Sequence, residues 1–373
     1  MLTLESLART NHATAAGAAP RPVPTSRPRI VAIGGGTGLP ALLRGLRRAL
    51  YPDSAFQQKG PPPECLTAIV TVTDDGGSSG RLRRELGMLP PGDVRNCLAA
   101  LAPEDSPLAT LLQYRFTGEN SLSGHAIGNL LLAALTQMTG EFQTAVEKLS
   151  SLMRLRGCVL SSTPENVTLV AEFHGGETVR GERAIAARGS QIKRLWLEHP
   201  VRPLPEAVRA LVNADVIVVG PGSLYTSILS NLLVGGIAST LSGVNAVRIY
   251  VANLMTEPGE TDGFTLDDHL AVIRQHVGFD LFDYVLVNRR PIPPAIAAHY
   301  ASRGSVPVRA GRVRALGART GIVERDLACQ FDGNRIRHAP GDLAEAILEL
   351  AHTGRLSVPD DRARPAQAVC MSA

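Results

Sequence analysis

Short runs of β-branched and aliphatic residues alternate along the chain with stretches in which apolar residues recur every three or four positions. The first pair predicts a strand at Arg29–Ile33 and an amphipathic helix at Leu39–Leu50. Later runs predict further strands at 66–73, 215–219, 247–252 and 284–287, and further helices at 93–98, 125–138 and 342–351. Strands that alternate with helices are typical of a mostly parallel sheet flanked by helices. The pattern therefore predicts an α/β fold.

This alternation is interrupted over residues 157–197. Within that range, Val167–Phe173 and Glu177–Arg183 are separated by Gly175-Gly176, which predicts an antiparallel hairpin. We therefore expect a small antiparallel excursion inserted into one domain that spans residues 29–354.

The two tails, residues 1–28 and 355–373, lack hydrophobic periodicity and are predicted to be a disordered leader and a disordered tail. They carry most of the formal net charge of +4, with +2 in the leader and +1 in the tail, which leaves +1 for the body between them. A nearly neutral body lacks the basic surface that sequence-independent nucleic-acid binding requires. Nucleic acid is therefore not an expected partner.

The five cysteines are odd in number, widely spaced and outside any Cys-x-x-Cys or Cys/His pattern. This spacing favours a reducing compartment and argues against disulfides and zinc. An uncharged run, Val216–Val247, is long enough to suggest a membrane span, but Gly220-Pro221-Gly222 and Gly235-Gly236 interrupt it. With no apolar signal segment at the N-terminus, we expect a cytoplasmic protein without membrane insertion.

Polar or glycine-rich loops follow several predicted strands, and in open α/β sheets ligands bind at those strand ends. The first loop, Ile33–Pro40, offers backbone amides at a helix start to an anion. It is not a Walker motif, and it misses the dinucleotide fingerprint because Leu39 stands where the third glycine belongs. A tight turn without a ligand is the alternative. The helix that follows carries three arginines predicted to form a solvated face: Arg44, Arg47 and Arg48.

The second loop, Thr73–Arg81, places two carboxylates directly after an apolar strand. If strand geometry persists, Asp74 and Asp75 point to opposite faces, so one contacts a ligand and the other caps the turn. A carboxylate beside an anion-binding loop suggests ribose hydroxyls or a divalent cation, and oxygen ligands favour Mg²⁺. A surface Asx-turn is the alternative for either residue alone.

The third and fourth loops bring mixed chemistry. In Pro90–Asn96, Asp93 is predicted to be a helix N-cap, and Arg95 is the better candidate for a ligand contact because it can bind a phosphate bidentately. In the fourth, His125 and Asn129 are spaced to share one helix face, and flanking glycines favour a site. A buried, hydrogen-bonded histidine is the alternative there.

The fifth loop, Val219–Ser227, again joins a strand to a helix start through Gly220-Pro221-Gly222 and offers hydroxyl donors. The sixth loop begins after the next strand and places Asn253 at its mouth. Each loop is weak evidence by itself, but together they predict one ligand site along a single edge of the sheet.

Six segments, taken in order, resemble the gluconeogenesis-factor (YvcK) branch of the CofD-like family: IGGGTGLPALLRGLR, TDDGGSSGRLRRELG, PPGDVRNCL, GHAIGNLLLAAL, GPGSLYTSI and NLMTEPGET. The resemblance runs from about Arg29 to Leu350 and implies one modified Rossmann-like domain with a nucleotide site at the strand ends. In the family's other branch, a phospholactyl group is transferred from a guanosine diphosphate carrier to a deazaflavin with magnesium. The branch resembled here is linked to UDP-sugar binding, and to cell shape and peptidoglycan synthesis during gluconeogenic growth.

The resemblance also implies site residues. Asp74 stands at the metal position and Asn129 beside the phosphates. The nucleotide pocket is implied to include Gly35, Gly36, Thr37, Gly38, Gly222, Ser223, Leu224 and Tyr225, with Tyr300 and Arg337 at polar positions late in the pattern. His125-Ala126-Ile127 departs from the usual pattern, where a small hydroxyl or aromatic residue is more common.

Two hypotheses follow from different classes. In the first, the protein is a UDP-sugar-binding regulator that needs no cofactor and controls a cell-wall synthesis or signalling protein. We expect it to be a homo-oligomer, namely a dimer. In the second, it is a transferase in which Asp74 and Mg²⁺ stabilise a diphosphate leaving group and His125 serves as general base. A nicotinamide dehydrogenase is disfavoured because both the third glycine and the acid about 20 residues later are missing.

Overall fold

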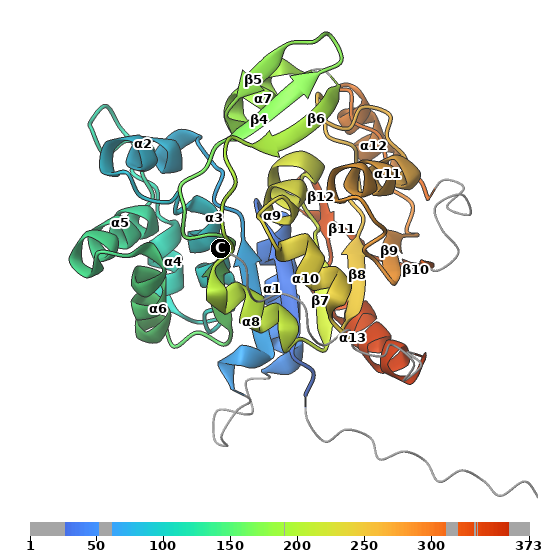
Figure 1. The fold of residues 1–373 in the computed structure, drawn as a ribbon, viewed down its shortest axis with the longest axis horizontal. Coiled ribbons are helices and arrows are strands. Elements are labelled where there is room, and N and C mark those ends of the chain that lie inside the picture. Colours follow the sequence, from blue (N-terminus) through green and yellow to red (C-terminus); the bar gives the residue numbers. More distant parts are fainter. Residues whose placement is uncertain are drawn as a thin grey trace, which may run out of the picture.

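The computed structural model describes residues 27–51, 62–189, 191–310, 320–331, 333 and 335–357. Its centre is a seven-stranded parallel sheet in the order β10-β9-β8-β7-β1-β2-β3 (Figure 1). The strands of this sheet are β1 (Ile30–Gly34), β2 (Leu66–Val70), β3 (Cys158–Ser161), β7 (Val216–Val219), β8 (Val247–Val251), β9 (Tyr284–Asn288) and β10 (Gly321–Arg325).

Helices cover both faces of the sheet. One face carries α1 (Gly38–Leu50), α3 (Gly92–Leu101), α5 (Ile127–Thr139), α6 (Phe142–Met153) and α13 (Pro340–Ser357). The other carries α8 (Pro205–Val212), the π-helical turn η3 (Leu224–Leu229), α9 (Ser230–Leu232), α10 (Ile237–Gly243) and α11 (Leu266–Val277). The remaining elements are η2 (Pro63–Cys65), α2 (Gly77–Leu86), α4 (Pro107–Gln113), α12 (Pro294–Ala301) and the hairpin β11 (Ala328–Phe331) and β12 (Arg335–His338).

The central strands are apolar throughout because both of their faces are covered. In β1, Ile30 and Ala32 belong to the hydrophobic cluster on one face, and Val31 and Ile33 belong to the cluster on the other. Alternate residues of a strand point to opposite faces, so an uninterrupted apolar run serves both clusters. Each such side chain contributes about 1.5–3 kcal/mol when fully buried.

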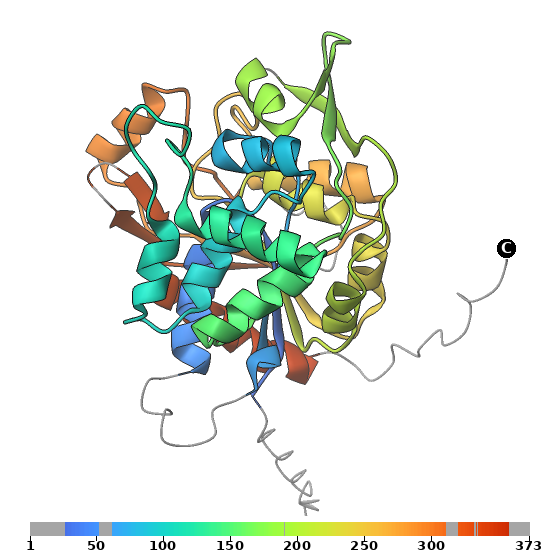
Figure 2. The same cartoon turned by 90° about the vertical axis from the view of Figure 1, so that its left-hand side faces the viewer.

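The antiparallel excursion projects from one end of the sheet, at the top of Figures 1 and 2. It consists of β4 (Leu169–Phe173), β5 (Thr178–Arg180), β6 (Ile192–Leu197) and the short helix α7 (Glu182–Arg188), with strand order β5-β4-β6. The predicted hairpin and the α/β class are thus both confirmed. The predicted range of the excursion was too wide, because β3 at its start pairs with β2 in the parallel sheet.

Three local predictions differ from the structure. The segment after Asp75, expected to be a flexible turn, forms helix α2. The predicted helix at 125–138 starts at Ile127, so His125 precedes it. The final helix α13 continues to Ser357, past the predicted start of the tail at 355. The predicted disordered leader up to residue 26 and the tail from residue 358 lie outside the described residues.

The strand order reverses at β1. The chain proceeds from β1 outward through β2 and β3, then returns to β7 on the other side of β1 and continues outward to β10. The loops that leave β1 and β7 therefore diverge to opposite faces and open a crevice at their carboxyl ends, which is where ligands bind in such sheets.

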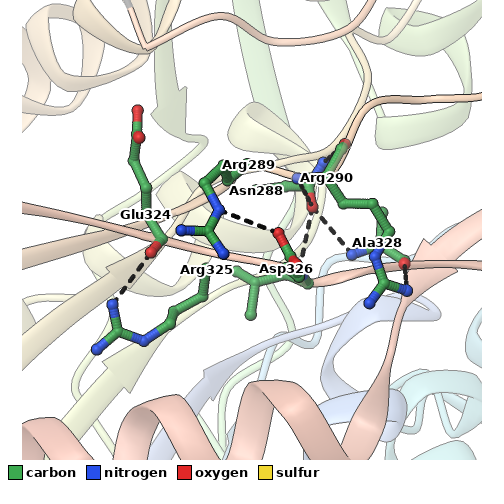
Figure 3. Close-up of polar contacts among 8 residues, drawn as sticks. Asn288, Arg289, Arg290, Glu324, Arg325, Asp326 and Ala328 are labelled. Atoms are coloured by element: carbon green, nitrogen blue, oxygen red, sulfur yellow. Dashed lines mark hydrogen bonds and ion pairs between the residues drawn. The ribbon is translucent and has the colours of Figure 1, made fainter.

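Asn288, at the carboxyl end of β9, attaches the β11–β12 hairpin to this end of the sheet (Figure 3). Its Oδ1 accepts hydrogen bonds from the backbone amides of Leu327 and Ala328, each at 3.0 Å. The Nη1 of Arg290 donates to the carbonyl oxygen of Ala328 at 3.0 Å. These bonds fix the hairpin whose second strand reaches the crevice.

Within the described part of the chain, no single helix has the length and apolar character needed to cross a membrane. One bent pair, Leu224–Leu232 with Ile237–Gly243, meets those criteria by length and composition only.

Candidate functional site

A cavity of about 650 Å³ opens at the switch point, and we call it the crevice. Five loops and the β11–β12 hairpin contribute to its wall, and α7 of the excursion closes one side. Among the residues predicted for the site, nine line it: Gly36, Thr37, Gly38, Asp74, Gly222, Ser223, Asn253, Tyr300 and Arg337. Such a volume suits a ligand the size of a nucleotide.

The floor of the crevice is the contact between the two glycine-rich loops. A Cβ atom at Gly38 would lie 2.3 Å from the carbonyl oxygen of Pro221, which no real side chain tolerates. Glycine at this position therefore lets the start of α1 approach the loop after β7. Gly222 completes the contact, because its backbone amide donates to Asn253 Oδ1 at 3.2 Å.

One side of the crevice, the acidic side, is formed by Asp74, Asp93 and Glu182. Asp93 lies in the first turn of α3 and its Oδ2 accepts a hydrogen bond from the Gly36 amide at 2.7 Å, so it is not the N-cap that was predicted. Burial raises the pKa of Asp93 to about 6, and the nearby charge of Asp74 adds to that rise. Burial likewise raises the pKa of Glu182 well above its ordinary value, although Thr73 Oγ1 donates to its Oε2 at 3.0 Å. Protons are therefore held on this side at higher pH than in isolated carboxyls.

The two neighbouring aspartates of the second loop divide their roles differently from the prediction. Asp74 lines the crevice and also closes its own turn, because its Oδ1 accepts from the Gly76 amide at 2.8 Å. Asp75 reaches the excursion, where its Oδ1 accepts from the Arg183 amide at 2.9 Å in the first turn of α7. The second loop therefore contributes Asp74 to the acidic side. Through Asp75 it also anchors α7, which carries Glu182.

The opposite side, the arginine side, is formed by Arg303 and Arg337. Arg337, on β12, donates from Nη1 to Thr37 Oγ1 at 2.5 Å, which joins the hairpin to the start of α1. The hydroxyl of Tyr300 accepts from the Ile336 amide at 3.1 Å. Both late positions implied by the resemblance thus line the crevice, and Arg337 contacts the first glycine loop.

A third part of the wall comes from the loops after β7 and β8. Ser223 Oγ donates to Glu260, and Asn253 Nδ2 lies 3.5 Å from Glu257 Oε1. Burial raises the pKa of Glu257 to about 7, with a further contribution from the charge of Glu260. These contacts hold Asn253 and Ser223 in fixed positions at the crevice mouth.

The remaining predicted residues lie elsewhere. Leu224 and Tyr225 are 0% and 1% exposed and belong to the hydrophobic core, because η3 turns them inward. Gly35 lies behind the wall, where a Cβ atom would be 2.7 Å from Asp93 Oδ2. Arg95 is buried and donates from Nη2 to Asn96 Oδ1 at 2.8 Å.

His125 and Asn129 meet through a residue that the sequence did not single out. Ser78 Oγ lies 2.9 Å from His125 Nδ1 and accepts from Asn129 Nδ2 at 3.0 Å. The two side chains do not share a helix face, since only Asn129 lies in α5. All three are buried and none lines the crevice, and burial lowers the pKa of His125. This arrangement matches the alternative of a buried, hydrogen-bonded histidine.

Several crevice residues were not predicted as site residues. Glu182 lies in the second segment of the predicted hairpin, Glu257 lies within the sixth loop, and Arg303 and His338 lie in ordinary polar contexts. His338 is held by a hydrogen bond to the backbone of Ala252, and burial lowers its pKa to about 4, so its ring is neutral at pH 7. Only the position after a predicted strand, as for Glu257, could have pointed to any of them.

The acidic side offers oxygen donors only, which is the chemistry that Mg²⁺ prefers. In the described ranges, no three His, Cys, Asp or Glu side chains form a group that could hold a metal ion by themselves. Mg²⁺ is commonly held by one or two carboxylates together with substrate phosphates. Asp74, with Asp93 beside it, fits that partial role, so these two residues would hold the ion when a phosphorylated ligand is present.

Comparison with known proteins places this site in a family. The family model described as 2-phospho-L-lactate transferase CofD matches residues 30–327. The chain belongs to the CofD family. Within the family, it is similar to the gluconeogenesis factor of Halalkalibacterium halodurans, at 44% identity over 323 residues, which cover 86% of this chain and 95% of that protein. The gluconeogenesis factor of Bacillus subtilis is 42% identical over 327 residues, covering 87% and 98%.

The solved structures agree with this assignment to the gluconeogenesis-factor branch of the CofD family. A crystal structure of a UPF0052-family protein from Bacillus halodurans matches with a TM-score of 0.78 at 42% identity, covering 86% of this chain and 99% of that one. The Rossmann-like parallel sheet and the family resemblance inferred from the sequence are therefore both confirmed.

Proposed function

We propose that this CofD-family protein is a regulator that binds a UDP-sugar in the crevice. Its occupancy would control cell shape and peptidoglycan synthesis during growth on gluconeogenic carbon sources, in the cytoplasm, through a cell-wall synthesis or signalling protein. The relatives named gluconeogenesis factor support the link to gluconeogenic growth in this proposal.

The observation that carries the binding proposal is the pairing of Thr37 with Arg337 at the start of α1. A diphosphate needs donors and positive charge, and a helix start with an adjacent guanidinium supplies both. Arg303 adds a second cation on the same side. The diphosphate of the ligand is therefore assigned to the arginine side.

The sugar and ribose hydroxyls are assigned to the acidic side and to the loop after β8. Carboxylates and amide oxygens accept hydrogen bonds from hydroxyls, and carboxyls that keep a proton can also donate. Burial raises the pKa values of Asp93 and Glu182, so these carboxyls take up protons, and the negative charge beside the diphosphate falls, at higher pH than for isolated carboxyls. A ligand with an anionic centre and hydroxyls at its ends fits this division.

A second candidate function is a Mg²⁺-dependent transfer of a phosphorylated group from a guanosine diphosphate-linked donor. It is favoured by the description of the family model and by the oxygen donors of Asp74 and Asp93. When bound, Mg²⁺ would neutralise charge on a diphosphate leaving group. The chain itself would bind the diphosphate through Thr37 and Arg337. His125, the predicted base, lies outside the crevice wall.

Calorimetric titration with UDP-N-acetylglucosamine, guanosine diphosphate and NAD, each with and without Mg²⁺, separates the two candidates. The regulator is expected to bind the UDP-sugar with one site per chain and to release no product in a subsequent turnover assay. Guanosine-selective, Mg²⁺-dependent binding followed by product formation would replace this proposal with the transferase.

A further inference from the structure

A second cavity, of about 530 Å³, lies beside the crevice between α1, α3, α4 and β12. We call it the side cavity. It shares Thr37 and Arg337 with the crevice, so the hydrogen bond between these two residues stands on the boundary of both spaces. Its other polar lining residues are Arg44, Asn96, Thr110 and Gln113.

The lining of the side cavity carries positive charge without a carboxylate. Two of its residues are arginines, Arg44 and Arg337, and none is Asp or Glu. Within the described part of the chain, no hydrogen bond or ion pair engages the guanidinium of Arg44. Partial burial lowers the pKa of Arg44, and the charges of Arg48 and Arg337 lower it further. Two cations therefore repel each other across this space, and an anion between them would relieve that repulsion.

Of the three arginines of α1 predicted to form one solvated face, Arg44 and Arg48 are exposed, and only Arg47 departs from that prediction. Arg47 is buried and donates to the carbonyl oxygen of Ala102. Arg48 is exposed and paired with Glu104. Arg44 alone faces the side cavity, so its lack of a carboxylate partner is particular to this position.

Neutral donors complete the lining. Asn96 Oδ1 accepts from Arg95 Nη2 at 2.8 Å and from Gln113 Nε2 at 3.4 Å. Because these two donors fix the oxygen side of the amide, Asn96 presents its NH₂ group on the opposite side. Thr110, on α4, adds a hydroxyl. Guanidinium, amide and hydroxyl donors around one space are the groups that recognise phosphate and carboxylate.

We propose that the side cavity is a second anion site, in which a phosphate or carboxylate group binds between Arg44 and Arg337 with Asn96 and Thr110 as further donors. The proposal does not depend on the identity of the crevice ligand. The anionic group has two possible sources. It is either a free small anion that binds alongside the crevice ligand, or one of that ligand's own phosphates.

The test is calorimetric titration of the full chain with inorganic phosphate in a phosphate-free, low-salt buffer. Arg44→Gln removes the charge unique to the side cavity, and Thr110→Glu places a carboxylate in it without touching the arginines. Arg48→Gln is the matched control, because this exposed arginine lies on the same helix outside the lining. Circular dichroism and thermal melting establish that each variant is folded.

The expected result is one phosphate site per chain whose affinity falls at least tenfold in Arg44→Gln and in Thr110→Glu and is unchanged in Arg48→Gln. Equal phosphate affinity in wild type and Arg44→Gln, or no phosphate binding by the wild-type chain, overturns the proposal. Titration of Arg44→Gln with UDP-N-acetylglucosamine then separates the sources. An unchanged affinity assigns the site to a free anion, and a matching tenfold loss assigns it to the crevice ligand's own phosphates. A failure of UDP-N-acetylglucosamine to bind the wild type would remove the proposed function while leaving the phosphate result standing.

Discussion

The two sides of the crevice face the same cavity, but they carry side chains of opposite charge and are held in place by different contacts. The acidic side, formed by Asp74, Asp93 and Glu182, is fixed by hydrogen bonds from two backbone amides and a threonine hydroxyl, of which only the Gly76 bond to Asp74 is local in the sequence. The arginine side is held by the contact between Arg337 and Thr37, residues that are 300 positions apart. The acidic side therefore depends on several contacts among the loops after β1 and β2, α3 and α7, and the arginine side depends on how the hairpin docks onto α1.

This difference matters for charge. Burial raises the pKa values of two acidic-side carboxyls, so the negative charge of that side varies with pH in the range where the arginines stay fully charged. The arginine side attracts a diphosphate equally at all pH values in this range. The acidic side repels the diphosphate more strongly as the pH rises and its carboxyls ionise. Four changes test this division, from the largest expected effect to the smallest.

Gly38→Ala should remove the crevice altogether. The new methyl group would lie 2.3 Å from the Pro221 carbonyl oxygen, so the two loops must separate and both sides lose their alignment. We expect loss of UDP-sugar binding in calorimetry and a loss of about 1–3 kcal/mol in the free energy of unfolding. Gly243→Ala, where a Cβ atom meets no other group, is the control. Wild-type affinity in Gly38→Ala would show that the loop contact does not shape the site.

Asp93→Asn should stabilise the protein at neutral pH. The pKa of Asp93 rises from 3.8 to about 6 on folding, so the folded state holds a proton more tightly than the unfolded state. The unfolding free energy of the wild type therefore falls as pH rises from about 4 to about 6, and remains lower above that, by up to about 3 kcal/mol from this group. Denaturant titrations at pH 4.5 and pH 7.5 would check it. The stabilising effect of Asp93→Asn should be full at pH 7.5 and reduced to about a third at pH 4.5. Asp105→Asn serves as an exposed control.

Arg337→Gln should weaken ligand binding more than it weakens the fold. A hydrogen bond to a charged group contributes about 1.5–3 kcal/mol, which corresponds to roughly a tenfold to hundredfold loss of affinity. Arg335→Gln on the same strand is the matched control, since Arg335 is exposed and does not line the crevice. Equal losses in the two variants would show that general charge, rather than the contact with Thr37, attracts the ligand.

Ser78→Ala should affect stability alone. Without the hydroxyl, buried His125 and Asn129 lose a common partner, which costs about 1–3 kcal/mol. Affinity for the crevice ligand should stay within about twofold, because none of the three residues lines that cavity. Ser242→Ala, at an exposed position, should change the unfolding free energy by less than about 0.5 kcal/mol. A large loss of affinity in Ser78→Ala would restore His125 and Asn129 as candidates for the site.

The fold and the general position of the site could be predicted because they depend on local patterns. Apolar runs marked the central strands, and the glycine loops after β1 and β7 marked the switch point. The resemblance added Tyr300 and Arg337, which no local pattern distinguishes and which the structure brings to the crevice.

Other features depend on tertiary contacts that no local pattern contains. Glu182 reaches the crevice only because Asp75 anchors the first turn of α7. Leu224 and Tyr225 follow a glycine loop, as ligand-binding residues often do, but the π-helical turn directs both into the core. The helix start near His125 was misplaced by two residues, and the partner of His125, Ser78, lies in α2, 47 positions earlier in the chain.

The contact between Thr37 and Arg337 also bears on how the molecule folds. Because its two ends come from the first and last parts of the domain, the ligand site exists only after the whole sheet and the final hairpin have assembled. Neither half of the chain can form it alone. A ligand that binds there stabilises the entire assembly by RT ln(1 + [L]/Kd), about 2.7 kcal/mol at a hundredfold excess over Kd. Ligand binding at this contact therefore raises the free energy of unfolding of the whole domain as well as filling the crevice.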